Sequence, residues 1–361
     1  MIPAAKPIIG DEEREAVDRV LRSGMIAGGP EVAAFESEFS EYVGGRHCIA
    51  MNSGTSALHL ALLAMGIGAG DEVIVPSFSF AATANSVALT GATPVFADID
   101  RATFNLDPRA ASAAITKRTK AIMPVHLYGQ MAAMDQFETL AQEHGLQIIE
   151  DAAQSHIASF NGRNAGEWGV TACFSFYPTK NMTSGEGGMV VTPDEKIARM
   201  LRLLRNQGME QRYRNEVIGF NTRMTDIHAA IGRVQLRKLP AWTKQRQANA
   251  TFLDANIKGV VVPPVAAGAS HVYHQYTIRV PVQTGEQRDA FRSSLAQKEV
   301  GSGVYYPTPI HRLPSFNLSL DLPETELAAH QVISLPIHPA LSSEDLKQIA
   351  DAVSSTASEL S

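Results

Sequence analysis

Gln147-Ile148-Ile149-Glu150-Asp151-Ala152-Ala153-Gln154-Ser155-His156 is a short apolar run followed directly by two carboxylates, an amide and an imidazole. A strand-length run with no polar alternation before its acidic end is typical of a parallel sheet covered on both faces. Ligands of such sheets bind beyond the carboxyl ends of the strands, so the residues after Ile149 are candidates for a functional site. Asp151 is equally consistent with a cap for a following helix.

Similar β-rich runs recur on both sides of this stretch and alternate with helical stretches. We predict strands at His47–Met51, Glu72–Val75, Pro94–Ala97, Ala121–Val125, Gln147–Glu150, Ala172–Phe174 and Gly188–Thr192. We predict helices between them at Ser56–Met65, Ala81–Leu89, Asp135–His144 and Asp194–Asn206. This alternation predicts an α/β protein with a mostly parallel central sheet and helices on both faces.

The sequence before and after this region lacks the regular alternation of strands and helices. Two amphipathic helices are expected before it, at Asp11–Arg22 and Pro30–Tyr42. After Met224 the pattern predicts two consecutive helices, one ending at Leu239 and one running from Pro240 to Ile257. Beyond them we expect strands at His274–Val280 and Val304–Tyr306 and helices at Gln287–Lys298 and Ser343–Ser354. We therefore expect a large domain over residues 1–235, and a connector helix with a smaller α+β domain over residues 236–361.

Composition excludes several classes of function for this 361-residue chain. It is 45% hydrophobic and 19% charged, with a formal net charge of -6, so neither disorder nor a broad nucleic-acid-binding surface is expected. No apolar stretch is long enough to span a membrane, and the amino terminus has no signal design, so we expect a cytoplasmic protein. Cys48 and Cys173 form no disulfide or metal pattern, and Asp98 and Asp100 are interpreted as turn residues, so no metal site is expected.

Two further segments could carry chemistry. Asn52-Ser53-Gly54-Thr55-Ser56 joins a strand to an apolar helix, where free backbone N–H groups suit a phosphate, although a plain helix cap explains the same residues. Lys180 lies in a loop rich in hydroxyls and glycines. It is consistent with an ordinary solvated lysine or with a partly desolvated nucleophilic amine. One local concentration of arginines fits a solvated face or an anionic-substrate contact: Arg202, Arg205, Arg212, Arg214 and Arg223.

Taken in order, these segments resemble one family. Its features are Gly-Thr-Ser-Ala-Leu from Gly54, Pro-Ser-Phe-Ser-Phe from Pro76, Glu-Asp-Ala-Ala-Gln-Ser-His from Glu150, and Ser-Phe-Tyr-Pro-Thr-Lys from Ser175 with Gly-Glu-Gly-Gly after it. The resemblance extends over nearly the whole chain through residues 26–30, 125–130, 219–226 and 334–339. The sequence is similar to the DegT/DnrJ/EryC1/StrS sugar aminotransferases, fold-type-I enzymes that use pyridoxal 5'-phosphate (PLP).

The resemblance implies a role for each matching residue. Lys180 matches the catalytic lysine that forms a Schiff base with PLP and shuttles the proton. Asp151 matches the carboxylate facing the pyridine nitrogen, and Gln154 matches the side chain beside the phenolic oxygen. Phe80 matches the aromatic that stacks on the ring. The implied phosphate ligands are Gly54, Thr55, Ser56, Ser175 and, from the neighbouring subunit, Asn221.

The resemblance also implies substrates and assembly. We expect amino transfer, with L-glutamate as donor, to a nucleotide-linked keto-sugar, with the 4-keto position favoured over the 3-keto by the segment from Gly219 to Asp226. A few members of the family carry His at the position of Lys180 and catalyse a dehydration. Because this sequence keeps the lysine, a dehydration is disfavoured. A homodimer with shared sites is expected. The alternatives are a keto-cyclitol substrate, a nicotinamide-dependent sugar oxidoreductase and a non-catalytic PLP-binding sensor. The expected sugar contacts are Tyr177, Tyr306, His311 and His338; His126 and His156 are equally consistent with structural histidines.

Overall fold

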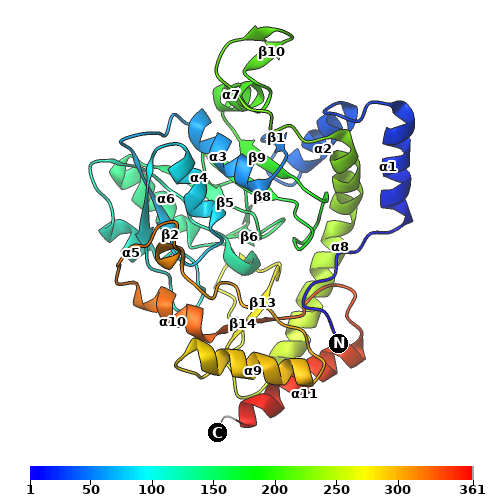
Figure 1. Cartoon of the computed structure of the whole chain (residues 1–361), viewed down its shortest axis with the longest axis vertical. Helices are drawn as coiled ribbons and strands as arrows, with labels where there is room; N and C mark the ends of the chain where they lie inside the picture. Colours follow the sequence, from blue (N-terminus) through cyan, green and yellow to red (C-terminus); the bar gives the residue numbers. More distant parts are fainter. Residues whose placement is uncertain (360–361) are drawn as a thin grey trace.

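The computed structural model describes residues 1–359, which are built around a seven-stranded sheet of order β1-β9-β8-β5-β4-β2-β3 (Figure 1). All neighbouring pairs from β8 to β3 are parallel, and β9 is antiparallel to β8 and β1. The prediction of a mostly parallel α/β sheet is therefore confirmed. The strands are β1 (His47–Met51), β2 (Glu72–Pro76), β3 (Thr93–Ala97), β4 (Thr119–Ile122), β5 (Gln147–Asp151), β8 (Thr171–Ser175) and β9 (Gly188–Thr192).

Both faces of this sheet are covered by helices. Successive residues of a strand point to opposite faces, and Ile148 and Ile149 accordingly belong to two different apolar clusters. The cluster around Ile148 includes residues of α2 (Pro30–Ser40) and α6 (Met134–His144). The cluster around Ile149 includes residues of α3 (Gly54–Ala64), α4 (Ala82–Leu89) and α7 (Glu195–Arg205). Burial on both sides explains why the strands are continuously apolar.

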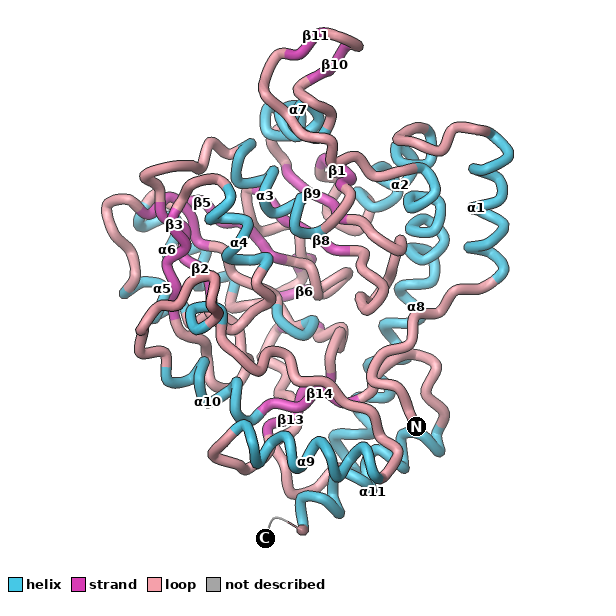
Figure 2. The backbone as a smooth tube through the Cα atoms, in the orientation of Figure 1, coloured by secondary structure: helices cyan, strands magenta, loops and turns pink. Residues whose placement is uncertain are grey.

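One long helix, α8 (Asp226–Asn256), connects the sheet to the C-terminal part (Figure 2). The prediction of two helices divided at Pro240 is wrong, since Pro240 lies inside α8. Proline lacks an N–H donor and costs about 3 kcal/mol within a helix. Here buried residues continue on both sides of it, including Leu239 and Leu253, and their packing offsets that cost. The expected division at residue 235 lies within α8 and stays a prediction.

The C-terminal part packs strands and helices around its own apolar cluster, as expected of an α+β unit. Its strand pair is antiparallel, β13 (Tyr276–Arg279) with β14 (Val332–Leu335). The expected strand over residues 304–306 is wrong: this segment is a loop that follows an isolated bridge between Gly303 and Ser334. The helices are α9 (Gly285–Gln297), α10 (Pro323–Gln331) and α11 (Ser343–Ser358). Asp98 accepts hydrogen bonds from the backbone N–H groups of Glu324 and Thr325, so it caps α10 from a distance in sequence.

The remaining elements are short or peripheral. α1 (Asp11–Ser23) packs on α8. A hairpin of β10 (Met209–Gln211) and β11 (Arg214–Asn215) forms an arm that projects beyond α7 (Figure 1). No helix in residues 1–359 is both long and apolar enough to cross a membrane. The other elements are α5 (Pro108–Ala113), the 3-10 turns η1 (Leu127–Gly129) and η2 (Ile310–Arg312), and a small sheet of β6 (Ser159–Phe160), β7 (Arg163–Asn164) and β12 (Ala269–Ser270).

Candidate active site

The carboxyl ends of β2, β5 and β8 bring together several residues that the sequence singled out. Phe80 follows β2, Asp151 ends β5, and Ser175 ends β8, with Lys180 in the loop that follows. Since parallel strands end at one edge of a sheet, residues more than 70 positions apart meet there. The site is therefore a product of the sheet order and not of any one segment.

The start of α3 forms a cradle of small residues beside β8. Ser53 caps the helix by accepting a hydrogen bond from the Ser56 N–H at 3.1 Å. The N–H groups of Gly54 and Thr55 occupy the first turn, where a helix supplies no acceptor. A Cβ at Gly54 would lie 2.8 Å from the Ser175 Cβ, so only glycine allows this approach. The cradle thus presents two free amides and the Ser175 hydroxyl, while the amide of Ser56 is already used by the cap.

Asp151 is a buried carboxylate held by a hydroxyl and a backbone amide. Thr83 Oγ1 donates to its Oδ2 at 2.7 Å, and the Ala153 N–H donates to its Oδ1 at 3.2 Å. No Lys, Arg or His within residues 1–359 forms an ion pair with it. Burial raises the pKa of Asp151, and the Thr83 hydrogen bond offsets part of that rise. A cation placed beside Asp151 would be stabilised by the carboxylate and would lower its pKa.

Lys180 provides an amine of reduced basicity next to this carboxylate. Its backbone N–H donates to the Tyr177 carbonyl at 2.9 Å, which closes the turn that carries the side chain. Loss of surrounding water lowers the pKa of Lys180 to about 8, against the opposing effect of the Asp151 charge. Near neutral pH a useful fraction of this amine is unprotonated, so it can act as a nucleophile or a base.

Gln154 and two aromatic residues form a further wall of the site. Gln154 Oε1 accepts a hydrogen bond from the Tyr128 N–H at 2.7 Å, and its Nε2 donates to the Tyr306 hydroxyl at 3.1 Å. Both ends of the amide are therefore fixed. Phe80 is 59% exposed although it is a large apolar side chain, and its ring lies 6.2 Å from that of Tyr306. An exposed ring beside an anchored amide suits a flat ligand.

The other predicted contact residues are placed differently. Tyr177 is half exposed beside Lys180, whereas His311 is fully buried and both its ring nitrogens face protein partners, Ser77 and Glu326. His338 is buried next to the lysine loop. Asn221 is exposed after the arm and makes no side-chain hydrogen bond to the other site residues described here. The contacts of these residues with substrate or cofactor stay predictions.

Sequence reasoning missed the residues that support Asp151. Thr83 lies in a predicted helix, and nothing in its local sequence marks it as a partner of Asp151. The neighbouring Glu150 is buried and accepts hydrogen bonds from His126 Nε2 at 3.0 Å and from backbone N–H groups of the loop 166–169. His126 is thus a satisfied structural histidine. His156 differs, because neither ring nitrogen meets a hydrogen-bond partner in the described chain.

Comparison with known proteins points to one family. A model of the DegT/DnrJ/EryC1/StrS aminotransferase family matches residues 7–354. The pleiotropic regulatory protein of Geobacillus stearothermophilus is 42% identical over 95% of this chain and 93% of its own. The dTDP-3-amino-3,4,6-trideoxy-alpha-D-glucose transaminase of Streptomyces venezuelae is 42% identical over 98% and 94%. Among solved structures, the PLP form of Spr1654 from Streptococcus pneumoniae has a TM-score of 0.95 at 27% identity, covering 100% of this chain and 99% of that one.

The residues at the sheet edge fit PLP. The free amides of Gly54 and Thr55 and the Ser175 hydroxyl suit its phosphate. Asp151, buried without a cationic partner among the described residues, suits the protonated pyridine nitrogen. The exposed ring of Phe80 suits the face of the heterocycle, and Lys180 supplies the amine.

Proposed function

The chain belongs to the DegT/DnrJ/EryC1/StrS aminotransferase family and uses PLP, and on that premise we propose that it transfers an amino group from L-glutamate to the ketone of a nucleotide-linked keto-sugar. The observation that carries the proposal is that Lys180, whose pKa is lowered, and Asp151, a buried carboxylate, lie at the same edge of the sheet. The name of the transaminase from S. venezuelae supports a sugar as the acceptor.

The chain's own residues would perform three tasks. Bound PLP supplies a carbonyl carbon that exchanges amino groups and a ring that withdraws electrons. Lys180 accepts and returns a proton at its Nζ, which its lowered pKa permits near neutral pH. Asp151 holds the proton on the pyridine nitrogen, and Thr83 keeps the carboxylate in place. Gln154, anchored at both ends, fixes the phenolic edge of the ring.

The acceptor's reacting carbon is the finer part of the proposal. The segment from Gly219 to Asp226 resembles the part of the family that acts on 4-keto sugars, whereas the name of the S. venezuelae relative specifies a 3-amino sugar. Both ketones therefore belong in the first panel of acceptors, with a keto-cyclitol beside them. The relative described as a regulatory protein supports a second candidate, a PLP-binding sensor, which would show no turnover with any of them.

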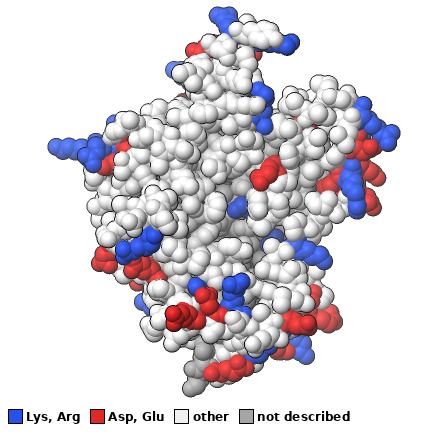
Figure 3. All heavy atoms as spheres, in the orientation of Figure 1, with Lys and Arg blue, Asp and Glu red and all other residues white. Residues whose placement is uncertain are grey.

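We further propose that the working unit is a homodimer in which the arm reaches a second copy. The arm and the segment after it expose large apolar side chains, with Tyr213 at 81% and Ile218 at 93% exposed. Basic side chains gather at the tip of the same arm (Figure 3). Asn221 follows this apolar segment and would complete the phosphate site of the partner. We expect Asn221→Ala to weaken PLP retention without unfolding the chain, and Ile218→Asp to shift the sedimentation profile toward monomer.

Turnover of defined substrates tests the reaction. The purified protein is incubated with L-glutamate and a panel of nucleotide-linked 3-keto and 4-keto sugars, and release of 2-oxoglutarate is measured. Lys180→Ala should abolish release, while Lys196→Ala, an exposed lysine in α7, should leave it unchanged. A wild-type protein that binds PLP but transfers no amino group with any donor or acceptor would favour the sensor.

A further inference from the structure

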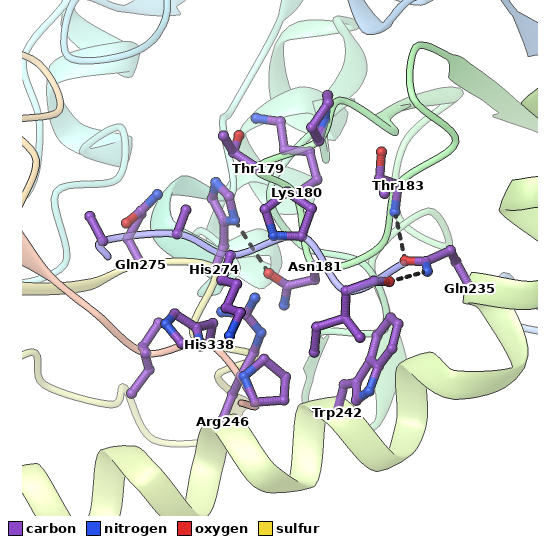
Figure 4. Close-up of a pocket in the computed structure, with 18 residues that line it drawn as sticks. Thr179, Lys180, Asn181, Thr183, Gln235, Trp242, Arg246, His274, Gln275 and His338 are labelled. Atoms are coloured by element: carbon purple, nitrogen blue, oxygen red, sulfur yellow. Dashed lines mark hydrogen bonds between the residues drawn. The ribbon is translucent and has the colours of Figure 1, made fainter. Parts of the chain in front are cut away.

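A narrow pocket below Lys180 contains basic groups and no carboxylate among the described residues that line it. It lies between the N-terminal segment over residues 4–8, the lysine loop, α8 and the segment after β14 (Figure 4). Arg246 rises into it from α8, with His338 beside it and Lys180 above them (Figure 4). Lys6 also lines the pocket. No Asp or Glu is found among the lining residues in the part of the chain that the structure describes.

Arg246 is the main anomaly of this pocket. Its side chain is only 7% exposed, its Nη1 donates to the Tyr273 carbonyl at 3.0 Å, and its Nε has no hydrogen-bond partner among residues 1–359. No carboxylate in residues 1–359 forms an ion pair with it. Burial alone lowers the pKa of Arg246 to about 10. A buried guanidinium without a counter-ion is unfavourable, and an arriving anion would remove that cost.

His338 shows the same need for a ligand. It is 4% exposed, and neither ring nitrogen meets a hydrogen-bond partner in the part of the chain that the structure describes. Burial lowers the pKa of His338, and the charges of Arg246 and Lys6 lower it further, while the Pro3 backbone and the charge of Asp345 act in the opposite direction. Burial lowers the pKa of His274, and the charges of Lys180 and Arg246 lower it further, so the pocket and the reactive amine share one electrostatic environment. Arg246, His338, Lys6 and Lys180 thus line one small pocket.

We propose that this pocket binds a carboxylate of the amino-acid donor, with Arg246 as its charge partner and His338 and Lys6 as additional donors. The proposal rests on the function proposed above and assigns the donor's place in it. A guanidinium matches a planar carboxylate through two parallel N–H groups. The flat ring of Trp242 also lines this narrow space. Lys180 lines the same pocket, so a carboxylate held there lies beside the reacting amine.

Equilibrium binding of a donor mimic tests this site without turnover. Glutarate, a five-carbon dicarboxylate without an amine, is titrated calorimetrically into the PLP-loaded protein. We expect Arg246→Gln to weaken glutarate binding by about tenfold to hundredfold, and Arg246→Lys to recover part of the loss. Arg288→Gln is the matched control, because Arg288 is 4% exposed and also donates to a backbone carbonyl, but it pairs with Asp289 far from this pocket. Unchanged glutarate binding by folded Arg246→Gln would overturn the proposal.

Two further ligand titrations complete the test. If Arg246→Gln does not fold, the wild-type protein is titrated with glutaramide, the neutral diamide: binding at least tenfold weaker than glutarate supports the carboxylate site, and equal binding overturns it. D-glucuronate tests a sugar carboxylate as the source, and tighter Arg246-dependent binding of glucuronate than of glutarate would overturn the donor assignment.

A separate measurement shows whether the proposed amino transfer itself fails. L-glutamate alone should convert the PLP absorbance of the wild-type protein. Conversion that persists at the same donor affinity in Arg246→Gln refutes this site but leaves the aminotransferase intact. Arg246-dependent glutarate binding without any conversion by L-glutamate supports the carboxylate site and refutes L-glutamate as the donor.

Discussion

Replacing Thr83 with valine isolates the hydrogen bond that supports Asp151. Valine matches threonine in shape but has no hydroxyl, so the 2.7 Å bond from Thr83 Oγ1 to the buried carboxylate disappears. A hydrogen bond to a charged group contributes about 1.5–3 kcal/mol, and one pKa unit corresponds to about 1.36 kcal/mol. The pKa of Asp151, already raised by burial, should therefore rise by about one to two units more. Ser79, whose hydroxyl lies 2.8 Å from Thr83 Oγ1, also loses a partner.

The loss of this hydrogen bond should change PLP binding more directly than it changes the rate of turnover. A carboxylate that is easier to protonate holds the pyridine proton less well, so we expect PLP affinity to fall by roughly 10- to 150-fold. The assay is titration of the apo protein with PLP, together with the ¹⁵N chemical shift of pyridine-labelled PLP followed against pH. The acidic limb of that shift should move to higher pH, since the affected pKa rises.

Two variants separate positioning from simple loss of packing. Thr83→Ser keeps the hydroxyl and should retain most of the PLP affinity. Ser86→Ala removes a buried hydroxyl of the same helix that donates to the Thr83 carbonyl and not to Asp151, so its ¹⁵N profile should match the wild type. An unchanged PLP affinity and an unchanged pH profile in folded Thr83→Val would refute the assigned role.

Two further perturbations test the electrostatics of the sheet edge. The rate at which PLP joins Lys180 in the apo protein, followed by visible absorbance, should rise with pH around a midpoint near 8. Asp151→Asn should lower that midpoint, because the Asp151 charge raises the pKa of Lys180. A midpoint near the ordinary lysine value of 10.5 would contradict the desolvation of Lys180. Glu150→Gln should lower the free energy of unfolding in urea by about 3–5 kcal/mol, because amide hydrogens would face backbone donors. Glu138→Gln, at a half-buried surface ion pair with Arg163, should cost less than about 1 kcal/mol. Burial raises the pKa of Glu150, but the hydrogen bonds from His126 and the backbone amides lower it more, so the folded pKa lies below the ordinary glutamate value. The stabilisation by Glu150 is therefore present above the unfolded pKa and is lost as the pH falls through the folded value. Equal losses in the two variants would refute the role of burial.

Much of the fold could be predicted because its signals are local. The runs His47–Met51 and Gly188–Thr192 coincide with β1 and β9, since a strand buried on both faces needs a short, continuously apolar segment. Pro240 misled the prediction because a helix-breaking residue acts locally, whereas the burial that keeps α8 intact comes from distant segments. The loop over residues 304–306 looked like a strand because β-prone residues cannot show whether a partner strand is in register.

The sequence by itself determined the α/β architecture and marked Lys180, Asp151 and Gln154 as expected cofactor residues, because apolar periodicity and ordered motifs are properties of neighbouring residues. Only the tertiary structure decided what surrounds them. Thr83 reaches Asp151 across 68 positions through the order of the parallel strands, and Arg246 is one of many arginines until folding buries it without a counter-ion. Burial and hydrogen-bond partners are set by the path of the whole chain, and they determine whether a titratable residue is structural or functional.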